Sequence, residues 1–107
     1  SDDDYRAALA DKERISAAFA AVFADVPVLA GPTVAYPAPP EDPPFGTQEG
    51  DVEGRFTGPY NIAGVPAISL PSGLADGSLP AGLQLAAATG NDALLLSVAE
   101  AYEEVAP

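Results

Sequence analysis

Two serines, Ser69 and Ser72, and the single lysine, Lys12, are the residues of this chain that suggest nucleophilic catalysis. A serine hydroxyl attacks a carbonyl when a neighbouring base takes its proton, and a neutral lysine can be that base. Lys12 lies between Asp11 and Glu13, whose negative charges favour its protonated form. The sequence has no histidine and no cysteine, which excludes a Ser-His-Asp triad, a Cys-His dyad and a zinc site with such ligands. We therefore predict no catalytic residue within the chain.

Several acidic residues stand close enough in sequence to suggest paired-carboxylate or cation chemistry. Glu103-Glu104 and the run Asp2–Asp4 could serve as an acid and a base, as in glycosidases. Both lie on polar terminal segments, where solvated charge is the simpler interpretation. Asp51, Glu53 and Asp76 could bind a hard cation, but their spacing is not that of a calcium loop. We predict no metal site and no cofactor.

The charge of the chain excludes whole classes of partner. The chain has sixteen acidic and four basic residues, which give a net charge of −12 over 107 residues. Binding to phosphates needs clustered Lys and Arg, so we predict no nucleic-acid partner, and an anionic membrane would repel the chain. The first residues, Ser1–Asp4, are acidic where a signal peptide is basic. We expect a cytoplasmic location and an internal cut in a longer protein; a salt-adapted source is an alternative to an ordinary acidic one.

Two amphipathic helices are predicted near the ends of the sequence. Residues 4–24 carry apolar side chains at three-to-four spacing, with Asp2, Asp3 or Asp4 as the predicted N-cap. Residues 92–105 form a second such segment, and Asn91 is its predicted cap. Each helix has one apolar face that must pack against another element.

The segment between these helices predicts three strands and one short helix. Short apolar runs at 26–30, 66–70 and 82–87 are typical of strands, and Asp76-Gly77 indicates a turn with a longish loop between the last two. Residues 57–63 predict a short helix, with Thr57 as its cap and Gly64 at its end. Residues 32–54 are rich in proline and acid, so they form a solvated linker or a loop packed near a substrate entrance.

The run from Phe56 to Gly73 reads FTGPYNIAGVPAISLPSG, and residues 79–85 read LPAGLQL. These two segments resemble the C-terminal portion of the amidase signature family, whose members read F-T-x-P-x-N-x-x-G-x-P-A-x-S-x-P-x-G and then G-L-P-x-G-L-Q-L. That family cleaves amides with two serines and a lysine carried by an upstream Gly/Ser-rich segment. The chain has no such segment, and neither Ser69 nor Ser72 corresponds to the family nucleophile.

The resemblance also implies candidate pocket residues. In the family the motif that begins at Phe56 packs beside the active centre, which makes Phe56, Thr57, Tyr60 and Asn61 candidates for residues that line or support a substrate pocket. The alternative is purely structural, with Thr57 as a cap, Asn61 as a loop anchor and the aromatic rings in the core. Related tRNA-dependent amidotransferase subunits often carry an acid two positions before the Phe-Thr pair. Gly54 stands there, which favours a general amidase.

Two interpretations follow for residues 1–107 as a whole. The first is an α/β fold, part of the amidase-signature fold, in which two amphipathic helices and a short helix surround a small mixed sheet with one hairpin. The chain would then be a C-terminal fragment of a hydrolase that cleaves carboxylic amides through an acyl-enzyme, with the upstream segment as its partner and a small amide as substrate. The second is a non-catalytic interaction module derived from the amidase tail.

Overall fold

The computed structural model describes residues 1–106, and its first element is the long helix α1, Asp2–Asp25. Ser1 is the N-cap: its Oγ accepts a hydrogen bond from the Asp4 N–H at 3.2 Å, while the Asp4 carboxylate bonds back to Ser1. The predicted helix is confirmed, but the prediction that Asp2, Asp3 or Asp4 caps it is wrong. Asp4 instead completes a reciprocal capping box from inside the first turn.

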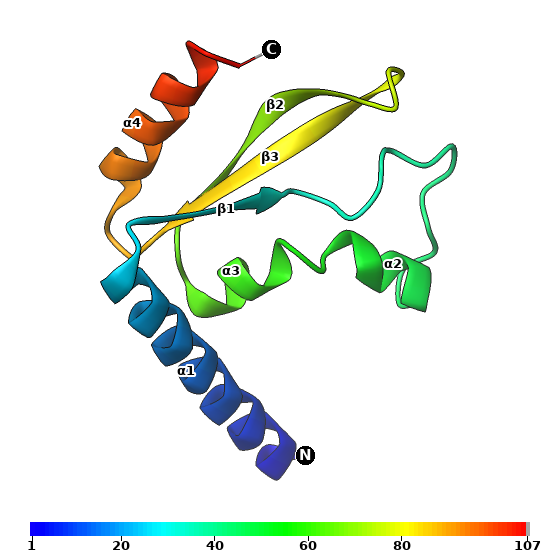
Figure 1. Ribbon diagram of the computed structural model, residues 1–107. Helices are drawn as coiled ribbons and strands as arrows, with labels where there is room; N and C mark the ends of the chain where they lie inside the picture. Colours follow the sequence, from blue (N-terminus) through cyan, green and yellow to red (C-terminus); the bar gives the residue numbers. More distant parts are fainter. Residues whose placement is uncertain (107) are drawn as a thin grey trace.

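Three strands form one sheet in the order β1-β3-β2 (Figure 1). They are β1 Val28–Pro32, β2 Ala67–Ala75 and β3 Leu79–Ala87. Both pairings are antiparallel, so the expectation of a mixed sheet fails for the part of the chain that the structure describes. The strand predicted at 26–30 begins two residues later, after Pro27, which cannot donate to a ladder.

The hairpin between β2 and β3 is confirmed, but its strands are longer and its loop shorter than expected. Asp76 and Gly77 both have positive φ, 50° and 74°, and the Ser78 N–H closes the turn on the Ala75 carbonyl at 3.0 Å. A bulge between Pro71 and Leu74 interrupts the ladder. The bulge lets an apolar, proline-containing segment continue as a strand where the sequence pattern suggested its end.

Helix α4, Asp92–Glu103, covers one face of the sheet and makes the main core with it (Figure 1). Alternate residues of β3 point toward α4, including Leu85 and Ala87, and they meet Leu95 and Ala99. The predicted apolar face is confirmed in part, because Leu94 is 40% exposed. Asn91 occupies the N-cap position, as predicted, but its side chain makes no capping hydrogen bond.

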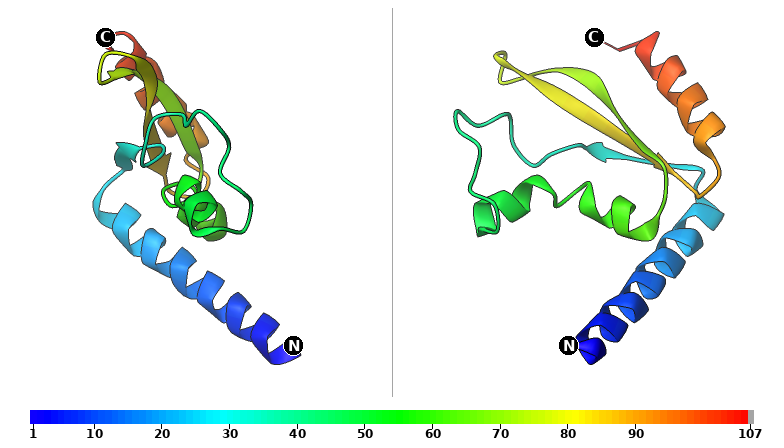
Figure 2. Two further views of the ribbon diagram at one scale, coloured as in Figure 1. Left: turned by 90° about the vertical axis from the view of Figure 1, so that its right-hand side faces the viewer. Right: turned by 180° about the vertical axis from the view of Figure 1, so that it is seen from behind.

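The short helix α3, Gly58–Ala63, and the second half of α1 pack against each other on the other side of the sheet (Figure 2). Gly64 ends α3 in a left-handed conformation with φ 71°, as the sequence predicted. Thr57 occupies the N-cap position, as predicted, but its side chain makes no capping hydrogen bond. The sheet therefore lies between α4 on one face and the pair α1 and α3 on the other.

Part of the segment predicted as linker or loop is helical. Helix α2, Gln48–Glu53, begins at Thr47, whose Oγ1 accepts from the Gly50 N–H at 3.2 Å. Residues 33–47, here named the proline-rich loop, join β1 to α2 along the outside of the molecule (Figures 1 and 2). The sequence did not predict this short threonine-capped helix, because the surrounding prolines and acidic residues favour an extended, solvated segment.

The molecule is flat, with extents of 48 × 36 × 17 Å and a radius of gyration of 15.9 Å. A compact domain of about 100 residues has a radius near 13 Å. The N-terminal half of α1 extends away from the sheet (Figure 2), and Tyr5 is 67% exposed there. Among residues 1–106, no helix is both long and apolar enough to cross a bilayer.

Candidate functional site

Polar side chains of β3 and β2 lie in a row on the face of the sheet opposite α4. Gln84 of β3 lies in register between Gly31 of β1 and Ser69 of β2. Its side chain is only 6% exposed, and its Nε2 donates to the carbonyl oxygen of Phe56 at 2.9 Å. A buried amide needs such a partner, so this bond fixes the start of the Phe56 motif onto the central strand.

The hydroxyls of Thr33 and Ser69 meet above Gly82, at 2.6 Å between Oγ1 and Oγ. Ser69 belongs to the edge strand β2, and Thr33 directly follows the edge strand β1, with its N–H donating to the Gly82 carbonyl at 3.0 Å. The hydroxyl pair therefore bridges over the central strand. A Cβ on residue 82 would lie 2.7 Å from the Thr33 oxygen and 2.9 Å from the Ser69 oxygen. Glycine is therefore the residue that permits this contact.

A small cavity of about 190 Å³ lies beside this row and joins it to α3. Its walls include Phe56, Tyr60 and Gln84, and the ring of Phe19 from α1 lies tilted by 55° against that of Tyr60, with 5.3 Å between ring centroids. Two of the four predicted pocket residues, Phe56 and Tyr60, are thus brought together on one wall. The sequence alone leaves the role of Gln84 open between a buried hydrogen bond and an outward-facing position.

The other two predicted residues lie outside that wall. The Thr57 carbonyl accepts from the Asn61 N–H at 3.3 Å, and the Asn61 carbonyl accepts from the Gly64 N–H at 3.3 Å. The side chain of Asn61 is exposed. In residues 1–106 these two positions therefore serve the α3 backbone rather than the cavity.

The site lacks the parts of a nucleophilic centre within the described residues. Ser69 has one hydrogen-bond partner there, the Thr33 hydroxyl, which is no base. Lys12 is exposed on α1, in the half of that helix that has no half-buried residue. No group of three or more acidic residues is placed to hold a metal ion in the part of the chain that the structure describes.

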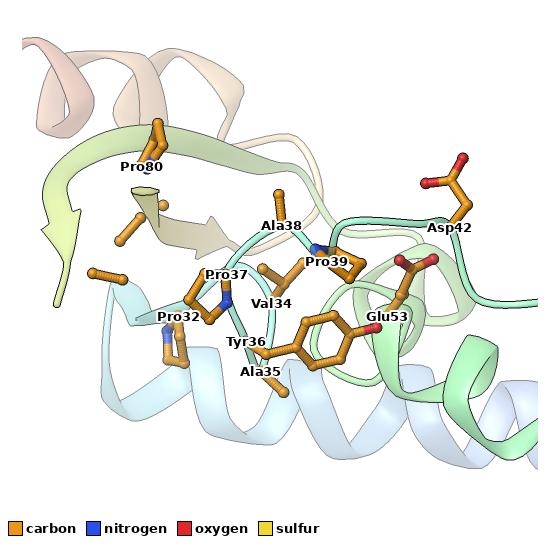
Figure 3. Close-up of a pocket in the computed structure, with 13 residues that line it drawn as sticks. Pro32, Val34, Ala35, Tyr36, Pro37, Ala38, Pro39, Asp42, Glu53 and Pro80 are labelled. Atoms are coloured by element: carbon orange, nitrogen blue, oxygen red, sulfur yellow. The ribbon is translucent and has the colours of Figure 1, made fainter. Parts of the chain in front are cut away.

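A larger cleft of about 640 Å³ opens between the proline-rich loop and the β2–β3 hairpin (Figure 3). The Tyr36 hydroxyl is buried without a hydrogen-bond partner among the described residues, and it points toward the Glu53 carboxylate. Burial, and then the negative charge of Glu53, raise the pKa of the Tyr36 phenol above its usual value. The sequence suggested Glu53 only as a cation ligand and did not suggest Tyr36, because the two are 17 positions apart in a segment that resembles a linker.

Comparisons with known proteins all match this chain to amidases and related enzymes. The family model described as Amidase matches residues 1–96. The A subunit of the glutamyl-tRNA(Gln) amidotransferase from Thermus thermophilus is 39% identical over 104 residues, which are 94% of this chain and 21% of that protein. The 6-aminohexanoate-cyclic-dimer hydrolase of a Pseudomonas strain is 48% identical over 52 residues, 49% of this chain and 10% of the hydrolase.

Two solved structures give the same result in three dimensions. A crystal structure of an amidase matches with a TM-score of 0.83 at 28% identity and covers 100% of this chain and 26% of that one. The A subunit of the glutamyl-tRNA(Gln) amidotransferase from Thermotoga maritima matches with a TM-score of 0.72 at 29% identity, over 90% of this chain and 21% of that one. The chain spans about a fifth of the length of the first curated relatives it matches.

Proposed function

The chain belongs to the amidase family, and we propose that it forms the C-terminal portion of a hydrolase that cleaves carboxylic amides through an acyl-enzyme. The observation that carries this proposal is the family match, which runs from residue 1 to residue 96 without a Ser-Ser-Lys segment inside it. The nucleophile and the base would come from the upstream segment of a larger parent. This chain would supply the end of the sheet and a wall of the substrate pocket.

We assign that wall to Phe56 and Tyr60, held in place by the bond from Gln84 to the Phe56 carbonyl. Thr57 and Asn61 would act through the backbone of α3, which carries Tyr60. An aromatic wall with one fixed polar group suits the carbon skeleton of an amide substrate and leaves the chemistry to other residues.

The relatives bear names of two kinds, since some are amidotransferase subunits and one is a cyclic-dimer hydrolase. Gly54, at the position where the amidotransferase subunits often have an acid, still favours a general amidase. The substrate would then be a small amide rather than an aminoacylated tRNA. A cytoplasmic location stays a prediction from the sequence.

A chimera tests the proposal directly. The region of the crystallised amidase that matches all of this chain is replaced by residues 1–107, and hydrolysis of an amide that the parent amidase cleaves is measured. We expect the chimera to fold and retain hydrolysis, whereas the amidase without that region loses it. A folded chimera without any activity, beside an active parent, would contradict the proposed role.

The alternative, a stand-alone interaction module, predicts a different result for the chain by itself. The fragment interpretation expects no amide hydrolysis by the chain alone, since Ser69 and Ser72 lack a base. Ammonia release from simple aliphatic and aryl amides measures this. Turnover that survives repurification and disappears in Ser69→Ala or Ser72→Ala would overturn the fragment interpretation.

A further inference from the structure

The cleft beside the proline-rich loop has the size and the walls of a small-molecule site (Figure 3). Its volume, about 640 Å³, lies inside the range of roughly 300–1,000 Å³ that is typical of such sites. Prolines and alanines of the loop and of the hairpin form most of the lining. The aliphatic part of a ligand could therefore cover this surface without burying polar protein groups that would need hydrogen-bond partners.

The charged groups that line the cleft are all of one sign. They are Asp42 and Glu53, and no lysine or arginine of the described chain lines it. Arg55, two residues beyond Glu53, lines the separate small cavity instead. No ion pair of residues 1–106 involves either carboxylate. The cleft thus combines an apolar surface with uncompensated negative charge at its edge.

The Tyr36 hydroxyl adds a polar group inside the cleft. Its oxygen is shielded from solvent and has no hydrogen-bond partner in residues 1–106. Figure 3 shows it directed toward the Glu53 carboxylate. A buried hydroxyl without a partner costs free energy. A ligand donor placed between Tyr36 and Glu53 would provide that partner, because both oxygens can accept from an ammonium group.

We propose that this cleft binds a small amine whose ammonium group lies between Tyr36 and Glu53, while its aliphatic body covers the proline-rich wall. Asp42, farther along the rim, adds attraction at longer range. This binding needs no amide hydrolysis and does not rest on the proposed function. The geometry selects against a carboxylate ligand, which would meet two negative charges, and offers a neutral alcohol hydrogen bonds without the attraction between opposite charges.

The test compares three probes of equal chain length: 1-hexylamine hydrochloride, 1-hexanol and sodium hexanoate. Each is titrated into the isotope-labelled chain at pH 7, and amide chemical shifts give the dissociation constants. We expect shifts at residues of the loop and hairpin, and hexylamine to bind about fivefold tighter than hexanol, the scale of one or two partly exposed charge contacts. Hexanoate should bind most weakly.

Variants distinguish the contribution of the Glu53 charge to binding from that of the apolar lining. Glu53→Gln should remove most of the preference for the amine and change the affinity for hexanol little, whereas Tyr36→Phe should lower the affinity for the amine more than that for hexanol. Glu49→Gln is the matched control, since Glu49 lies on α2 outside the cleft and its loss removes the same charge. Sodium chloride at 1 M should weaken the preference for the amine, because the Debye length falls to about 3 Å.

Equal affinity for amine and alcohol, shifts elsewhere in the chain, or equal effects of Glu53→Gln and Glu49→Gln would overturn the inference. If the chain alone gives the narrow amide dispersion of an unfolded polypeptide, the same titration on the chimera decides, with Glu53→Gln and Glu49→Gln introduced there. An inactive chimera that shows the Glu53-dependent preference contradicts the proposed function only. An active chimera without that preference contradicts this inference only.

Discussion

At the scale of single residues, the bond from Gln84 to the Phe56 carbonyl holds the site together. Replacing the amide by the similarly sized thioether in Gln84→Met removes the donor, and within residues 1–106 no backbone N–H takes its place at the Phe56 oxygen. We expect a loss of about 1–3 kcal/mol in the free energy of unfolding. Urea denaturation measures it. Gln48→Met, on exposed α2, is the control and should change stability little.

Gly82 carries the second prediction at this scale. The Cβ of Gly82→Ala would lie under 3 Å from the Thr33 and Ser69 hydroxyl oxygens, so the hydroxyl pair must separate. We expect a destabilisation of about 1–3 kcal/mol, as for other overpacked sites. In the matched control Gly58→Ala, the new Cβ meets nothing within 4 Å. Equal unfolding midpoints for the two variants would show that the contact above residue 82 is loose.

At the scale of elements, α1 attaches to the molecule through its second half only. Its half-buried residues all lie between Ile15 and Phe23. The Phe19 ring packs in a tilted arrangement against Tyr60, and the Ser16 hydroxyl donates to the Ala63 carbonyl at 3.2 Å. This contact joins α1 to the helix that carries the predicted pocket wall. The position of Tyr60 therefore depends on a helix that is otherwise exposed.

Phe19→Ala should detach α1 without unfolding the sheet. We expect a local loss of about 1–3 kcal/mol, less than for a fully buried phenylalanine because Phe19 is half-exposed. Amide hydrogen exchange should speed up over residues 15–25, while β3 and α4 keep their protection. Leu9→Ala, in the free half of α1, is the control. Unchanged exchange in both variants would mean that the contact with Tyr60 contributes little.

At the scale of the whole molecule, much apolar surface has no partner. The chain exposes 7316 Å², whereas a compact monomer of this mass exposes about 5,500 Å². Among residues 1–106 no large side chain is fully buried, and Leu96 of α4 is 60% exposed. These open faces agree with a part of a larger fold. We expect the isolated chain to be partly disordered or associated, and to gain order with the remaining sheet.

The acidic surface gives a prediction about salt. Two ion pairs occur among the described residues, and they engage only Asp4 and Asp11, so most of the net charge of −12 is unopposed. Raising NaCl from 0.01 M to 1 M shortens the Debye length from about 30 Å to 3 Å, and the thermal midpoint should rise. The triple variant Glu100→Gln, Glu103→Gln and Glu104→Gln should respond less. A flat midpoint in both would mean that repulsion is already small.

The sequence by itself determined the family, the helix and strand types, and the lack of a catalytic triad. These depend on local patterns: the motif from Phe56 to Gly73, the apolar periodicity of the two long helices, and the missing histidine and cysteine. Gly64 is a clear case, because its place after a short helix predicts the left-handed end that is observed. The N-cap of α1 was harder to predict, because Ser1 is followed by three aspartates that are almost equally suitable as caps.

Only the tertiary structure decided which residues meet. Gln84 and Phe56 are 28 positions apart and Thr33 and Ser69 are 36 apart, so only the packing of loops against the sheet brings them together, and no local pattern predicts it. The same holds for Tyr36 and Glu53, which face each other because the proline-rich loop folds back beside the hairpin. Thr57 and Asn61 were predicted as part of a site from the motif alone, yet neither lines the small cavity that Phe56 and Tyr60 border. Local propensity depends on residues that are close in sequence, whereas a site depends on contacts between distant segments, which form only when the chain packs.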